Sequence, residues 1–433
     1  MNKHKIVSKE TLIPYILVTA LFYLWALPNN LNDILIPQFM KSFELNRLQA
    51  GLVQSAFYLG YFLLAMPAAM IMDKYNYKTG LIIGLLLFAT GCYLFWPAAL
   101  LGNYLFFLLA LFVIASGLAF LETGSNSFIA VLGDPETSAQ RLNLSQAFNP
   151  LGAMSGVLIG TVFIFSGTEH NNTQIEAMKL AGTYKPYLHN EILRVGPPYL
   201  IIGSIILFMA FLIWRIKFPV EKTATATGEK RGKISALFTY PHFIKGVVAQ
   251  FFYVGAQVGT WSFLIQYVKD YLHKPEKEAG MYLFISLLVF GVGRFIATAL
   301  MRRFEPGKLM GLFTSINILM VITAILLPGF IGAWALVLSS FFMSLMFPTI
   351  FALGIKGLGP NTKLGGSMII MAIIGGAIWT PLMGLISDKT GSLALAMIVP
   401  LISYIYIAYY SFIGSIPKGK LYDTAPAGVI ASH

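Results

Sequence analysis

Long apolar blocks separated by short polar segments dominate this chain. Clear examples are residues 81–101, 104–120, 200–214 and 309–326. Each block is close to the ~20 residues that a helix needs to cross ~30 Å of hydrocarbon. In the first half of the chain, the blocks and their interruptions predict helices at 11–38, 48–72, 79–99, 103–132, 140–166 and 196–217.

A polar and basic stretch, residues 219–233 (PVEKTATATGEKRGK), follows the sixth predicted helix. Six more helices are predicted beyond it, at 240–269, 278–302, 308–328, 332–354, 362–388 and 391–414. Two sets of six helices are typical of secondary transporters built from parallel repeats. We therefore expect an all-α membrane protein with twelve transmembrane helices in two pseudo-symmetric six-helix bundles. Its expected parts are an N-terminal bundle (1–217), a cytoplasmic linker (218–238), a C-terminal bundle (239–414) and a cytoplasmic tail (415–433).

Composition supports a membrane location. The chain is 57% hydrophobic and 11% charged, whereas a soluble domain is about 25% charged. The net charge of +12 does not indicate a nucleic-acid partner, because the basic residues lie in short segments between apolar blocks. With both termini in the cytoplasm, about twice as many Lys and Arg residues fall on the inner side as on the outer side. We expect a multi-pass protein of the bacterial inner membrane, surrounded by the lipid bilayer.

Several classes of function lack their motifs in this sequence. There is no Walker-type Gly-Lys-Ser/Thr run, no metal-ligand cluster and no nucleophile motif. A membrane-bound enzyme or sensor is the rival class, but no soluble segment is long enough to form a domain of its own. We expect no enzymatic activity, no metal and no cofactor. A monomer is the default oligomeric state, because no helix carries a persuasive Gly-x-x-x-Gly face.

Asp33 lies inside the first predicted helix, where a charge is costly unless it faces a cavity. Asn29 and Asn30 precede it by four and three residues, so all three side chains share one helical face. Pro28 removes a backbone donor, which predicts a kink or an opening of the helix at this point. Irregular backbone at this depth is tolerated only beside protein or water, so we expect a cavity beside this polar face. The alternative is that Asp33 lies near the outer interface and is simply hydrated.

Glu122 follows a run of residues, 102–121, that contains no charge, and Asn126 lies four residues later. Removal from water favours the neutral form of a carboxyl group, as proton coupling requires. The alternative is a structural carboxyl group tied to a neighbouring helix. Arg294, in the eighth predicted helix, could neutralise a carboxylate or join helices, and we favour the structural role.

Uncharged polar side chains in other helices complete a possible binding site. Gln146 and Asn149 lie three residues apart in the fifth predicted helix. The seventh carries one polar stripe, formed by Gln250, Tyr253, Gln257 and Trp261. Amide and Tyr side chains can bond sugar hydroxyls, and Trp offers an apolar face to sugar C–H groups. The alternative is that these residues tie helices together, as polar side chains in membranes commonly do.

Charged turns follow the second and eighth predicted helices at corresponding places in the two halves. The first contains Asp73 and Lys74, and the second contains Arg302. Two interpretations are open: an ordinary solvated cytoplasmic turn, or a gate that closes the inner side.

Many of the polar residues named above belong to longer sequence segments. These and further segments lie at 29–39 (NNLNDILIPQF), 54–58 (QSAFY), 121–123 (LET), 141–149 (RLNLSQAFN), 253–257 (YVGAQ), 347–351 (FPTIF) and 373–376 (IIGG). This pattern resembles the bacterial L-fucose/proton symporters of the major facilitator superfamily, over nearly the whole membrane region. The resemblance implies one central site, alternately open to each side. It also ties Asp33 and Glu122 to proton coupling and sugar recognition, and places Gln146 and Asn149 in the cavity.

Two departures from the family pattern bear on the substrate. The resemblance leads us to expect Gln and Tyr at the positions of Met346 and Phe347, and the segment after Glu122 reads GSNS in place of AANP. Related glucose and galactose carriers usually lack the glutamate of the LET segment, so its presence favours L-fucose. A glucose or galactose carrier, driven by protons or by sodium, is the alternative.

Overall fold

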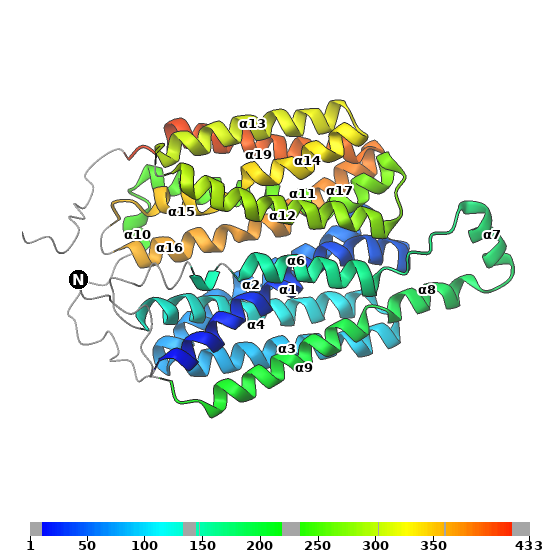
Figure 1. Cartoon of the computed structure of the whole chain (residues 1–433), viewed down its shortest axis with the longest axis horizontal. Helices are drawn as coiled ribbons and strands as arrows, with labels where there is room; N and C mark the ends of the chain where they lie inside the picture. Colours follow the sequence, from blue (N-terminus) through cyan, green and yellow to red (C-terminus); the bar gives the residue numbers. More distant parts are fainter. Residues whose placement is uncertain are drawn as a thin grey trace, which may run out of the picture.

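The computed structural model describes residues 11–132, 144–146, 148–218, 234–301, 303–358 and 361–417. The helices of the first half of the chain lie together in one bundle, coloured blue to green in Figure 1. Its long helices are α1 (Leu12–Ser42), α2 (Arg47–Lys74), α3 (Tyr77–Leu101), α4 (Tyr104–Val131), α6 (Asn149–Ile159) with a π-helical turn (Gly160–Ile164), and α9 (Gly196–Arg215).

The helices of the second half form the other bundle, coloured green to red in Figure 1. Three are single long helices: α11 (Pro241–Leu272), α12 (Glu276–Leu300) and α13 (Pro306–Leu326). The others are built from consecutive pieces: α14 (Phe330–Met343) with α15 (Met346–Ile355); α16 (Thr362–Met371) with a 3₁₀ turn (Ala372–Ile374) and α17 (Gly375–Thr390); and α18 (Leu393–Ala396) with α19 (Ile398–Tyr409) and a π-helical turn (Tyr410–Gly414).

The predicted fold class is confirmed. Within the described residues, eleven spans are long and apolar enough to cross a membrane. The remaining long helix, α11, has 32 residues and is the twelfth. Its amide and charged side chains lower its hydropathy, although it packs among the other long helices of its bundle.

The interruptions of the helices differ from those expected. The helix α1 continues through Pro28 and Pro37, so the opening predicted at Pro28 is absent. The tenth span is instead interrupted after Met343, between α14 and α15. There the hydroxyl of Tyr253 donates to the carbonyl oxygen of Met343 (3.1 Å), which satisfies a backbone group that the interruption leaves free.

Short helices occupy two connecting segments. The segments α7 (Asn172–Leu180) and α8 (Tyr184–Leu193) project from one end of the molecule before α9 begins (Figure 1). A single turn, α10 (Ile234–Leu237), precedes α11. The rest of the predicted linker, 219–233, lies outside the described residues, as do positions 418–433 of the predicted tail. The proposed domain limits therefore stay a prediction.

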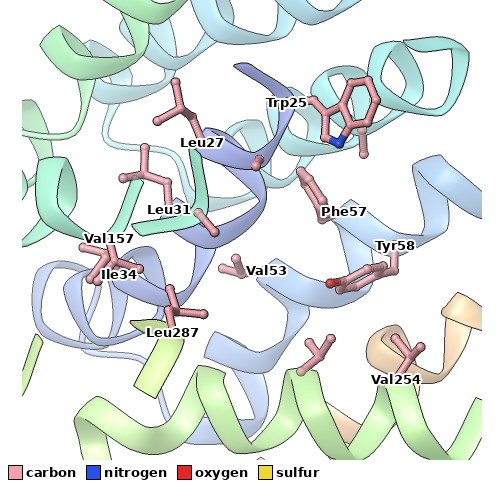
Figure 2. Close-up of a cluster of buried hydrophobic side chains, with 14 of the residues drawn as sticks. Trp25, Leu27, Leu31, Ile34, Val53, Phe57, Tyr58, Val157, Val254 and Leu287 are labelled. Atoms are coloured by element: carbon pink, nitrogen blue, oxygen red, sulfur yellow. The ribbon is translucent and has the colours of Figure 1, made fainter. Parts of the chain in front are cut away.

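The two bundles also make apolar contacts with each other. Figure 2 shows Ile34 of α1 beside Val157 of α6 and Leu287 of α12, and all three side chains are buried. Tight packing brings α2 and α17 together as well. A Cβ atom at Gly51 would lie 2.8 Å from the Cα atom of Pro381, and one at Gly384 would collide with the carbonyl oxygen of Arg47. Only glycine allows the two backbones to approach this closely.

Candidate functional site

A central cavity of about 160 Å³ lies between the two bundles. Its lining residues come from helices of both bundles. The lining combines polar groups with an apolar wall. The polar and amphipathic members are Asn29, Asn30, Asp33, Gln54, Tyr58, Asn149, Tyr253, Gln257, Trp261 and Arg294, and the apolar members include Val258, Leu287, Phe290 and Phe347.

Asp33 joins three helices of the cavity. Its Oδ1 atom accepts hydrogen bonds from Gln54 Nε2 of α2 (2.9 Å) and from Ser262 Oγ of α11 (2.9 Å). Gln54 Nε2 also lies 2.8 Å from Ser262 Oγ. The exposed fractions of the three side chains are 4%, 1% and 0%. The carboxyl group therefore lies in a closed polar triangle that connects the two bundles, and simple hydration at the outer interface does not describe it.

One face of α2 carries polar side chains that lie between Asp33 of α1 and Glu122 of α4. Gln54, Tyr58 and Tyr61 follow each other at four and three residues, which places them on the same side of the helix. The Tyr58 hydroxyl donates to Asn29 Oδ1 (3.4 Å), and Tyr61 is hydrogen-bonded to the Glu122 side chain. The face thus links the surroundings of both carboxyl groups. Sequence reasoning did not assign these α2 residues, although their spacing on a membrane helix was the available signal.

Glu122, Asn126 and Gln146 form a second group, which does not line the central cavity. Asn126 Nδ2 donates to the backbone oxygen of Glu122 (2.9 Å), one turn earlier. Gln146 Nε2 donates to Asn126 Oδ1 (3.2 Å), and its side chain is exposed. The predicted site residues therefore separate into a central set and this second set, formed by two residues of α4 and by Gln146 of the segment 144–146.

Three members of the predicted α11 stripe, Tyr253, Gln257 and Trp261, line the cavity. Trp261 Nε1 donates to Ser340 Oγ (3.0 Å), so the indole N–H is bonded within its own bundle and the ring is what it presents to the cavity. Gln257 makes no hydrogen bond to a described residue. Gln250 lies outside the lining; it is fully buried, and neither its amide nitrogen nor its oxygen has a partner among the described residues.

Other predicted residues of the cavity also make bonds that join or stabilise helices. Asn30 Nδ2 donates to the carbonyl oxygen of Ala26 in its own helix (3.1 Å). Asn149 Nδ2 lies 3.4 Å from the carbonyl oxygen of Phe22, which connects α6 with α1. The Arg294 guanidinium lies 5.1 Å from the centre of the Phe290 ring. Asn30 and Asn149 therefore reach the cavity and also support the helices around it.

Ion pairs join the bundles at the end that carries α7 and α8, which we call the ion-paired end. Lys41 Nζ contacts Glu191 Oε2 (2.6 Å) and, across the bundles, Glu276 Oε1 (2.7 Å). Lys269 of the C-terminal bundle contacts Glu169 of the N-terminal half (2.7 Å), so here the cation comes from the other side of the same boundary.

The start of α2 adds further links at this end. Arg47 pairs with Asp270 and donates to Ser387 Oγ (2.9 Å). The two oxygens of Asp388 accept from the backbone N–H groups of Arg47 (3.1 Å) and Leu48 (2.8 Å). Sequence reasoning did not predict this network, because each charge on its own looks like an ordinary helix end.

The predicted gate at the charged turns is not tested by the described residues. The helix α2 ends at Lys74, whose side chain is exposed and lies 5.4 Å from the centre of the Tyr75 ring. The side chain of Asp73 and all of Arg302 lie outside the described part of the structure. No group of three or more His, Cys, Asp or Glu residues in the described part could hold a metal ion.

Comparison with known proteins adds to this geometry. Residues 18–363 match the family model of the Major Facilitator Superfamily. The chain is 43% identical over 411 residues to the L-fucose-proton symporter of Escherichia coli (strain K12), covering 93% of each protein. It is 36% identical over 401 residues to a glucose/galactose transporter of Brucella abortus biovar 1 (strain 9-941), covering 92% of this chain and 93% of the relative.

Among solved structures, the crystal structure of the transporter FucP in the outward conformation matches with a TM-score of 0.69 at 42% identity. The match covers 93% of this chain and 99% of FucP.

Proposed function

Because the chain belongs to the Major Facilitator Superfamily, we propose that it is a proton-coupled sugar symporter that imports L-fucose by alternating access to the central cavity. The observation that carries the proposal is the position of Asp33. It is the carboxyl group in the lining of a cavity that otherwise offers amides, hydroxyls, aromatic rings and the guanidinium group of Arg294. A carboxyl group can carry the proton there, while the amides and rings suit a sugar.

The proposed cycle begins with protonation of Asp33 from outside, which favours sugar binding. The bundles then rock about the loaded site, and loss of the proton to the inside accompanies sugar release. A proton that moves down 100 mV releases ~2.3 kcal/mol, enough for a sugar gradient of roughly fiftyfold at one proton per sugar.

We further propose separate roles for the two sets of site residues. Asn29, Gln257 and the Trp261 ring contact the sugar in the central cavity. Glu122 acts with Asn126, Gln146 and Tyr61 at the border of the cavity and bonds sugar hydroxyls when the bundles move. Gln250 joins the binding set in a different arrangement of the bundles, since burial without a partner is costly to an amide.

The proposed setting is a bacterial inner membrane, with a monomeric protein and both termini in the cytoplasm. In that orientation the ion-paired end faces outside, and the ion pairs close the cavity on that side. The excess of Lys and Arg in the predicted inner segments supports the orientation. A cysteine placed in the 219–233 linker should then be labelled by an impermeant maleimide only after the membrane is opened.

A glucose or galactose carrier is the second candidate, and it is favoured by the Brucella abortus relative. The deciding experiment is uptake of radiolabelled L-fucose into energised vesicles, with a protonophore and with an excess of unlabelled galactose, glucose or arabinose. Accumulation that collapses with the protonophore and is competed best by L-fucose supports the proposal. Uptake that needs sodium, or that prefers another sugar, overturns the coupling ion or the substrate.

A further inference from the structure

We infer that Ser262 is the residue through which the C-terminal bundle senses the proton on Asp33. Ser262 lies on α11, and Asp33 and Gln54 lie on α1 and α2 of the other bundle. The Ser262–Asp33 hydrogen bond therefore joins the two bodies that move against each other. The inference rests on the proposed symport function and adds a positioning residue to it.

The direction of each hydrogen bond in the triangle follows from its donors. An amide nitrogen can only donate, so Gln54 Nε2 donates both to Asp33 Oδ1 and to Ser262 Oγ. The single hydroxyl proton of Ser262 is then directed to Asp33 Oδ1. That oxygen receives two donors, an arrangement that suits a carboxylate.

The strength of the Ser262 bond depends on the charge of its acceptor. Hydrogen bonds to an ionised group are roughly twice as strong as those between neutral groups. Loss of the proton from Asp33 therefore strengthens the link between the bundles in this arrangement. The effect is reciprocal: while the bundles are joined in this way, the Ser262 hydrogen bond favours loss of the proton from Asp33.

Among the described residues, Ser262 is the residue of the C-terminal bundle that is hydrogen-bonded to Asp33. The other titratable or charged side chains of the cavity are Tyr58 of α2, Tyr253 of α11 and Arg294 of α12, while α6 contributes the uncharged Asn149. Glu122 of α4 is bonded to Tyr61 and lies outside the lining.

The test measures how internal pH controls the initial rate of L-fucose uptake into proteoliposomes. Acid inside slows uptake, because the carrier must release its proton there. Ser262→Ala removes the donor, so the proton is held more tightly, by about fivefold. The internal pH of half-maximal uptake should rise by about 0.7 unit, the logarithm of that factor. Exchange of labelled for unlabelled L-fucose needs no proton release and should persist.

Two further variants separate the hydroxyl from packing. Ser262→Thr keeps the hydroxyl but adds a methyl group at a fully buried position, and it should keep the parental midpoint. Thr260→Ala alters another fully buried hydroxyl on α11 that has no partner among the described residues, and it should also keep that midpoint.

The outcomes distinguish this inference from the function on which it rests. A parent protein without proton-dependent uptake overturns the proposed function, and the inference with it. A coupled parent whose Ser262→Ala variant keeps the parental midpoint overturns the inference alone. Equal shifts in Ser262→Ala and in either Ser262→Thr or Thr260→Ala would show a packing effect and would also overturn it.

Discussion

Asp388 caps the start of α2 from the opposite bundle: its two carboxylate oxygens accept the backbone N–H groups of Arg47 and Leu48. The beginning of a helix carries free N–H groups and a partial positive charge, which an anion stabilises. In its own bundle, α2 already has Asn46 as its N-cap. Asp388 adds a negative charge to this helix start only when the two bundles meet at the ion-paired end.

We therefore predict that Asp388→Ala makes closure of the ion-paired end less favourable by about 1–2 kcal/mol, because the charge and two hydrogen bonds are lost. The measurement is maleimide labelling of a Ser55→Cys reporter, since Ser55 donates to the carbonyl oxygen of Ala377 across the boundary. Cys92, the single native cysteine, is buried and gives a low background. Labelling should accelerate in Asp388→Ala and not in Lys389→Gln; equal rates in both would contradict the capping role.

Lys41 holds two buried carboxylates, one from each bundle. The side-chain exposures of Glu191 and Glu276 are 5% and 0%. Lys41→Met leaves both carboxylates without this cation, which should disfavour closure of the ion-paired end by about 3 kcal/mol. A second change, Glu276→Gln, removes one of the two charges and should restore much of the loss. The same Ser55→Cys labelling reports both effects, and a double variant no better than Lys41→Met would contradict the pairing.

Gly384→Ala should prevent the ion-paired end from closing. The added Cβ atom would collide with the carbonyl oxygen of Arg47, which is backbone and cannot rotate away. Gly291→Ala is the matched control, because the nearest atom to its Cβ would be 4.0 Å away. We expect Gly384→Ala to bind sugar from outside and to lose both uptake and exchange. Normal exchange in this variant would show that α2 and α17 need not approach so closely.

Asp33→Asn removes the proton carrier and keeps the size of the side chain. Accumulation driven by a proton gradient should be abolished, since Asn cannot be protonated in the physiological range. Exchange of sugar across the membrane should continue at a measurable rate, because it requires no net proton movement. Vesicle uptake with and without a pH gradient, followed by exchange, provides both readings. Accumulation equal to that of the parent would remove Asp33 from the coupling role.

Glu122→Gln should weaken sugar binding by roughly tenfold, since a charge-assisted hydrogen bond becomes a neutral one. It should also flatten the pH dependence of binding, which tryptophan fluorescence can follow. Glu278→Gln, which alters an exposed carboxylate paired with Lys274, is the control and should have no effect. A parental affinity at every pH would leave Glu122 as a structural partner of Tyr61.

The architecture and the polar helices could be predicted because the membrane imposes a strong pattern. Apolar length alone locates eleven spans, and the spacing of Asn29, Asn30 and Asp33 locates one side of the cavity. The apolar blocks also predicted the seventh helix, at 240–269, although α11 is less apolar than the other spans.

The contacts across the bundles could not be predicted, because they join residues far apart in the chain. Ser262 is an ordinary serine in the sequence, and it acquires meaning only beside Asp33, 229 positions away. Glu122 and Gln146, which lie outside the central cavity, are a second case in which the sequence could not predict the position of a side chain in the fold. Helical spacing places them on polar faces, but it does not show that those faces lie outside the central cavity.

The polar stripe of α11 also has a consequence for biogenesis. Helices enter the bilayer from the translocation machinery according to their apolar content, and α11 is the long helix of the described chain that falls below the level of the others. The side chains that would hold a sugar are thus the ones that oppose insertion. The entry of α11 should depend on helices already in the membrane, above all α1, which supplies the carboxyl partner of Ser262.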